Sequence, residues 1–162
     1  MKRPAPDTNT PVRSLLKEDS SLQGAVKDGL GAVTKGHRDY LDVAIRDQFS
    51  DSLELDAAMH LGHEEENRWD YLLGHHPSEQ VVAVEPHSAK QDEISTVIRK
   101  REAARQQLKT HLKNGKSIAK WLWVASGKVH FADTEKARRR LDQSGIEFVG
   151  TRISAKHLPS GK

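Results

Sequence analysis

Hydrophobic residues recur with the spacing of helices in four segments of the chain. The clearest pattern is an apolar side chain at every fourth position from Leu41 to Phe49, which is typical of one helix face. Asp51, with Glu54 three residues later, resembles a capping box and predicts that another helix begins there. The longest helix has one apolar face, and Gly115 lies just beyond its expected end. The four predicted helices cover 38–49, 51–61, 92–113 and 134–144.

Four other segments have the pattern of β-strands. The first two show alternating apolar and polar residues and are joined by a polar turn at 74–78, which predicts a hairpin. The third is apolar on both faces, so we expect an interior strand with Trp121 and Trp123 in the core, followed by a turn at 126–128. The predicted strands cover 68–74, 81–90, 118–125 and 146–149. Strands and helices in this order predict an α/β fold with a small mixed β-sheet flanked by helices.

The pattern divides the chain into three parts. Residues 1–35 contain prolines and scattered glycines with few apolar residues, and predict a flexible or weakly helical N-terminal arm. Residues 36–153 carry the periodic segments and form the expected α/β domain. Residues 154–162 are expected to be a polar tail. The arm has no chemical motif, so it is a candidate for binding a protein partner.

Composition narrows the class of protein. The chain of 162 residues is 35% hydrophobic and 30% charged, which favours a modest core under a strongly charged surface. It has no cysteine, so disulfide frames and thiolate metal sites are excluded, in keeping with a reducing compartment. No apolar run approaches the length of a membrane span, and the first residues lack the apolar core of a signal peptide. We therefore expect a cytoplasmic protein without a membrane partner.

Charge is distributed unevenly along the chain. Residues 38–70 hold three basic and ten acidic side chains, a net charge of −7. Residues 99–120 hold eight basic and one acidic side chain, a net charge of +7. This asymmetry can place an acidic cation site beside a basic surface that receives an anion, and it equally fits two solvated faces of opposite charge.

The predicted hairpin carries the clearest chemical signal. Asp70 lies on the first strand, on the face opposite Trp69 and Tyr71, and Glu85 lies on the second strand. If the strands pair through the turn at 74–78, the two carboxylates stand side by side on a mostly apolar sheet. Such a pair is costly unless a cation or a proton holds it together. His87 shares the face of Glu85 and adds a group that titrates near neutral pH.

The order of the predicted elements resembles the core of the PD-(D/E)xK nuclease superfamily, also called restriction-endonuclease-like. In this order a helix is followed by a hairpin that carries Asp and then Glu, by a long helix and by a strand. The resemblance covers residues 38–125, and the chain is also similar to a bacterial protein of this type. Asp70 matches the first motif, with Trp69 in place of proline. Glu85-Pro86-His87 matches the second motif, with His87 in place of lysine.

The resemblance implies a hydrolase that cleaves phosphodiesters with Mg²⁺ or Mn²⁺. The implied metal ligands are Asp70, Glu85 and, from the preceding helix, Glu64. Lys100, which borders the apolar face of the long helix, is the first candidate for the displaced lysine, and Lys90 is the second. The basic residues that would meet phosphates of nucleic acid are Arg101, Arg105, Lys109 and Lys113.

Two other functions fit the same residues. The protein is alternatively an inactive module of this fold that binds nucleic acid or a protein, an interpretation favoured by the missing motif lysine. A third possibility is a small interaction protein in which Asp70, Glu85 and His87 form a structural hydrogen-bond cluster with Arg68. The distance between the carboxylates of Asp70 and Glu85 decides whether these residues form a metal site.

Overall fold

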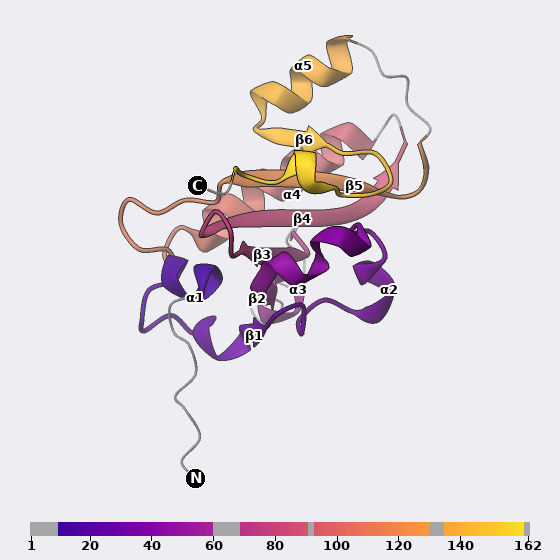
Figure 1. Ribbon diagram of the computed structural model, residues 1–162. Helices are drawn as coiled ribbons and strands as arrows, with labels where there is room; N and C mark the ends of the chain where they lie inside the picture. The colour runs from indigo at the N-terminus through magenta and orange to yellow at the C-terminus, as the bar shows by residue number, and fades with distance from the viewer. Residues whose placement is uncertain (1–9, 60–68, 91–92, 130–134, 161–162) are drawn as a thin grey trace.

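A mixed six-stranded sheet runs through the centre of the computed structural model, which describes residues 10–59, 69–90, 93–129 and 135–160 (Figure 1). The strands lie in chain order: β1 (Lys27–Asp28), β2 (Phe49–Glu54), β3 (Tyr71–His75), β4 (Gln80–Ala89), β5 (Lys120–Val129) and β6 (Ile146–Phe148). The pairs from β1 to β4 are antiparallel, whereas β4, β5 and β6 are parallel to one another. The α/β fold with a mixed sheet flanked by helices is therefore confirmed.

Two helices make the crossovers between the parallel strands, as parallel pairing requires. Helix α4 (Glu93–Leu108) connects β4 to β5, and α5 (Glu135–Gln143) connects β5 to β6. The remaining helical elements are short. They are α1 (Pro11–Leu15), η1 (Gln23–Ala25), α2 (Lys35–Arg38), η2 (Val43–Gln48), α3 (Leu55–Ala58) and η3 (Ala155–His157).

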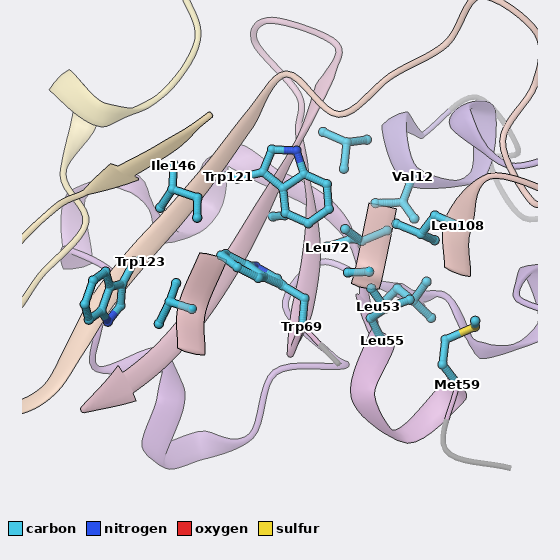
Figure 2. Close-up of a cluster of buried hydrophobic side chains, with 14 of the residues drawn as sticks. Val12, Leu53, Leu55, Met59, Trp69, Leu72, Leu108, Trp121, Trp123 and Ile146 are labelled. Carbon is cyan, nitrogen blue, oxygen red and sulfur yellow. The ribbon is translucent and has the colours of Figure 1, made fainter. Parts of the chain in front are cut away.

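Both faces of the sheet are covered, and each carries its own core. Helices α1, α4 and α5 cover one face, where Trp69 meets Trp121 edge to face at 5.2 Å between ring centroids (Figure 2). The opposite face packs against η2 and the C-terminal segment through residues such as Phe49, Val82 and Leu122. Side chains alternate between the two cores along each strand. Glu85 therefore shares the α4 face with Val81 and Ala83.

The helix predicted over 51–61 is wrong. Residues 49–54 form β2, and the helix that follows is the four-residue α3. Asp51 does not begin a helix and does not cap the one predicted here. It is fully buried on β2 and accepts hydrogen bonds from the backbone N–H groups of Val12 (3.1 Å) and Arg13 (3.0 Å) in α1. The acid thus caps a helix 39 residues earlier in the chain, a contact that local spacing does not contain.

The helix predicted over 38–49 is also wrong. Helix α2 ends at Arg38, Ile45 lies in the 3₁₀ helix η2, and Phe49 begins β2. Leu41, Ile45 and Phe49 nevertheless all enter one core. The spacing therefore indicates only that these three side chains are buried together. A series of short turns can bury them together as well as a helix can.

Two smaller expectations, one on the turn after the third predicted strand and one on Trp69, differ from the structure. Strand β5 continues through the turn predicted at 126–128, where Gly127 adopts a φ of 140° that side-chain-bearing residues rarely adopt. Trp69 lies in the same core as Leu72, not on the face of Tyr71. Alternation does not apply to Trp69 because β3 begins only at Tyr71. Trp121 and Trp123 are buried, as predicted.

The segments outside 36–153 contribute to the cores. Val12, Leu15 and Leu16 from the expected N-terminal arm are buried beneath the sheet, and Leu158 is buried on the opposite face. Within the described ranges, no helix has the length and hydropathy needed to cross a membrane.

Candidate functional site

The pairing of β3 with β4 places two acidic residues opposite each other. Tyr71 pairs with Val84 in an antiparallel register, so Asp70, one residue earlier, faces Glu85, one residue later. The backbone N–H of Asp70 donates a hydrogen bond to Oε1 of Glu85 at 2.9 Å. Glu85 is fully buried, and Asp70 is partly buried. The hairpin thus places the Glu85 carboxylate against the backbone of Asp70, the other acid that the sequence singled out.

Helix α4 supplies the cation that this pair needs. Lys100 lies on the side of α4 that faces the sheet, and its ammonium group donates a hydrogen bond to Oε2 of Glu85. Its side chain is 17% exposed, against 1% for Glu85. A buried carboxylate without a partner is strongly disfavoured, so this ion pair accounts for the burial of Glu85. Lys90, the other candidate lysine, is exposed just after β4.

The electrostatics of Asp70 differ from those of an ordinary surface acid. Loss of hydration and repulsion from Glu85 raise its pKa from 3.8 to about 7, and the charge of Lys100 only partly opposes the rise. Glu54 and Asp56 add smaller repulsions. Asp70 therefore exchanges a proton near neutral pH, and a cation in addition to Lys100 would stabilise its ionised form.

His87 continues the cluster along the same face of β4. Its Nδ1 lies 3.5 Å from Oε2 of Glu85, and its Nε2 lies 2.9 Å from Oε2 of Glu93 in the first turn of α4. Hydrogen bonding to Glu85, and then to Glu93, raises the pKa of His87 despite its partial burial. The indole N–H of Trp123 donates to the backbone carbonyl of His87 at 3.2 Å and fixes this end of the strand.

Glu93 is the member of the cluster that sequence reasoning missed. It stands at the start of the longest helix, where acidic residues are common for reasons of capping and dipole alone. Its position directly after a strand that carries Glu85 and His87 is the signal that indicates a different role. Its pKa is lowered by the hydrogen bond from His87.

The donor set suits a hard divalent cation in part. Asp70 and Glu85 offer the carboxylate oxygens that Mg²⁺ prefers, and Mg²⁺ completes its shell with water and phosphate. Among the described residues, no group of three His, Cys, Asp or Glu side chains is arranged to hold a metal ion. Glu64, the third ligand that the resemblance implies, lies outside the described residues, as does Arg68. Among the described residues, the chain thus offers two carboxylates as candidate ligands.

The four basic residues predicted to meet nucleic acid also come together. Arg101, Arg105, Lys109 and Lys113 line one pocket of about 330 Å³ at the C-terminal end of α4. The guanidinium of Arg101 lies over the ring of Trp121, 5.2 Å from its centroid. Glu85 meets α4 at Lys100, in the middle of the helix, and the pocket is lined by residues from Arg101 onward.

Comparison with protein-family models, curated proteins and solved structures gave no match. The geometry of the carboxylate pair is therefore the basis for assigning a function.

Proposed function

We propose that the protein is a divalent-metal-dependent phosphodiesterase that acts on DNA or RNA. The observation that carries the proposal is the clustering of Asp70, Glu85 and Lys100 where β4 meets the start of β3 and helix α4. Glu85 accepts hydrogen bonds from the backbone N–H of Asp70 and from the Lys100 ammonium on the crossover helix, and burial and repulsion from Glu85 raise the pKa of Asp70 to about 7. Perturbed groups clustered in this way are typical of active sites.

Each residue has a distinct role in this proposal. Asp70 and Glu85 hold Mg²⁺ or Mn²⁺, and Asp70 gives up its proton as the ion binds. Lys100 holds Glu85 in place and presents a positive charge to an oxygen of the scissile phosphate. His87, hydrogen-bonded to Glu85 and Glu93, places a positive charge beside the carboxylates when it is protonated. The bound ion would polarise the phosphodiester and lower the pKa of a water molecule.

The order of elements supports the same proposal. A hairpin with Asp70 and Glu85, a crossover helix with Lys100 and a parallel strand β5 follow one another as in the PD-(D/E)xK core that the sequence resembles. The lysine comes from α4 instead of β4. His87 occupies the place of the motif lysine on β4. It pairs with Glu93 on α4, the helix that also carries Lys100, the candidate for the displaced lysine.

A cleavage assay tests the proposal directly. Wild-type protein is incubated with plasmid DNA, single-stranded DNA and single-stranded RNA in Mg²⁺, in Mn²⁺ and in a chelator. We expect metal-dependent cleavage that Asp70→Asn and Glu85→Gln each reduce by about 100-fold or more, because each removes a metal ligand. Lys100→Met should reduce cleavage while the protein still binds the metal.

Metal binding is measured separately, so that loss of activity is not confused with loss of folding. Mg²⁺ should raise the Tm of the wild type, more at pH 8 than at pH 6 because Asp70 must lose its proton, and Asp70→Asn should abolish the shift. Asp47→Asn, which alters an exposed carboxylate, is the matched control and should change nothing. Cleavage that survives Asp70→Asn, or its absence on all three substrates with both metals, would refute the proposal.

A second function is favoured by one observation. Lys100 and His87, which stands in place of the motif lysine, both lie against the Glu85 carboxylate, so Glu85 has its counter-charge without a metal. An inactive module that binds nucleic acid would keep this arrangement. It would bind oligonucleotides with an affinity that falls steeply with salt, would cleave none of them, and would show no Tm shift with Mg²⁺.

A further inference from the structure

A second site is present at the C-terminal end of α4. The pocket of about 330 Å³ lies between the last turns of α4, the segment 109–118 and the first residues of β5. Its volume is at the lower end of the range for small-molecule sites. Its floor is apolar and includes an indole ring, with Leu108 and Trp121 drawn in Figure 2. The apolar residues that line it are Leu108, Leu112, Ile118 and Trp121.

The rim of this pocket is strongly positive. Its charged lining residues are all basic: Arg101, Arg105, Lys109, Lys113 and Lys116. Arg105 pairs with Glu102 at 2.9 Å. Within the described part of the chain, none of the three lysines makes an ion pair, so most of the rim charge has no counter-charge. Such an excess of like charge is unfavourable unless an anion binds or solvent screens it.

Arg101 links the rim to the floor. Its guanidinium is held against Trp121 and against the backbone of Gly145, where an added Cβ would meet its Nη2 at 3.0 Å. Burial and repulsion from Arg105 lower the pKa of Arg101. An arginine fixed in this way presents a pre-organised donor to a planar or multiply charged anion.

We propose that this pocket binds a nucleoside phosphate. The base and sugar would lie on the apolar floor, and the phosphate would meet the lysines and arginines of the rim. Inorganic phosphate alone would leave the floor unused, and an uncharged aromatic compound would leave the rim uncompensated. A nucleoside phosphate satisfies both with a single ligand of suitable size.

The position of the pocket is compatible with two ligands that carry a nucleoside phosphate. Trp121 pairs with Ala83, two residues before Glu85 on β4, and eight residues of α4, about 12 Å, separate Lys100 from Leu108. The ligand is either a free nucleotide or the phosphorylated end of a nucleic-acid strand that runs along α4 toward the carboxylate pair. The inference goes beyond the proposed phosphodiesterase activity and holds for an inactive protein as well.

Isothermal titration calorimetry tests the inference with defined probes. These are adenosine 5′-monophosphate, adenosine, inorganic phosphate, and one short oligonucleotide with and without a 5′-phosphate, all in a chelator so that no cleavage occurs. We expect adenosine 5′-monophosphate or the 5′-phosphorylated oligonucleotide to bind at least about tenfold more tightly than adenosine, phosphate or the unphosphorylated strand. Binding of the mononucleotide indicates a free ligand, and binding of the phosphorylated strand alone indicates a strand end.

Paired variants locate the binding. Lys109→Ala/Lys113→Ala should weaken the tighter probe by about tenfold or more, because two charge-assisted contacts are lost. Lys35→Ala/Lys156→Ala removes the same charge from exposed positions on elements of the other sheet face, and should leave the affinity unchanged. The inference is overturned if neither phosphorylated probe binds more tightly than its unphosphorylated partner, or if the two double variants weaken binding equally.

Discussion

Asp70 carries a carboxyl group whose ionisation is opposed from two directions. It has lost part of its hydration, and the carboxylate of Glu85 stands opposite, so its pKa rises from 3.8 to about 7 in the folded protein. The unfolded chain lacks both effects and ionises near 3.8. Between these two pH values the folded state binds more protons than the unfolded state, and proton binding therefore favours folding.

We expect the stability of the protein to fall as pH rises from about 4 to about 7. Above pH 7 the full penalty of ionised Asp70 is present, so Asp70→Asn should be more stable than the wild type at pH 8, by about 2 kcal/mol when the shift is halved for partial exposure. Urea unfolding at pH 5 and pH 8 measures this difference.

His87 also has a raised pKa and loses its contribution to stability in the same direction as pH rises, so the variant must be compared at both pH values. Asp47→Asn at an exposed position serves as the control and should follow the wild type. A pH dependence that Asp70→Asn leaves unchanged would contradict the assignment of the titration to Asp70.

Single residues of the site were partly predictable. The predicted pairing of two strands was enough to place Asp70 beside Glu85, and helical periodicity was enough to turn Lys100 toward the sheet. Glu93 was missed because the first turn of any helix favours an acid, so its identity alone carries no information about His87. Contacts between consecutive elements depend on the path of the intervening turn, which local patterns do not specify.

Among the elements, β2 and α1 depend on each other. Two backbone N–H groups at the start of α1 have no intrahelical partner, and Asp51 on β2 satisfies both. Gly74 on β3 pairs with Asp51 and leaves room for it, since an added Cβ would collide with its carboxylate. A helix of only five residues is not stable alone and persists through this contact and through packing.

Asp51→Ala should therefore lower the free energy of unfolding by about 2–4 kcal/mol, because two buried donors lose their acceptor. Asp51→Asn keeps one acceptor oxygen and should cost less. Chemical denaturation followed by circular dichroism gives both values. Asp47→Ala, an exposed acid in η2, should change the stability by less than about 0.5 kcal/mol. Equal effects at positions 51 and 47 would show that Asp51 does not hold α1.

In the whole molecule, backbone bridges outside the sheet join segments near both ends of the described chain to distant parts of it. Leu16 forms a backbone bridge with Leu112 beyond the end of α4, and Leu41 forms one with Ile153 near the C-terminus. Leu16 is fully buried in the α4 core. These contacts join segments about a hundred residues apart, so we expect the described parts of the chain to unfold as one cooperative unit.

Leu16→Ala tests this expectation. A buried leucine truncated to alanine costs about 2–5 kcal/mol, and here the loss should appear as a shift of a single transition observed equally by tryptophan fluorescence and far-ultraviolet circular dichroism. Val43→Ala, at a side chain that is 70% exposed, should leave the transition unchanged. Two separate transitions, or a loss confined to a minor early phase, would indicate that the N-terminal segment unfolds independently.

Sequence alone determined the features that depend on neighbouring residues. The hairpin, the long helix α4, the interior strand β5 and the buried tryptophans follow from periods of 2.0 and 3.6 residues, and they were sufficient to predict the α/β fold. Tertiary structure decided what depends on distant partners. Asp51 lies in a strand and not in a helix, and from there it accepts hydrogen bonds from α1. Val12, Leu15 and Leu16 belong to the core because they cover an apolar face of the sheet. The same spacing of apolar residues is compatible with a helix or with a series of turns. Which of the two forms depends on how these residues pack against the rest of the chain.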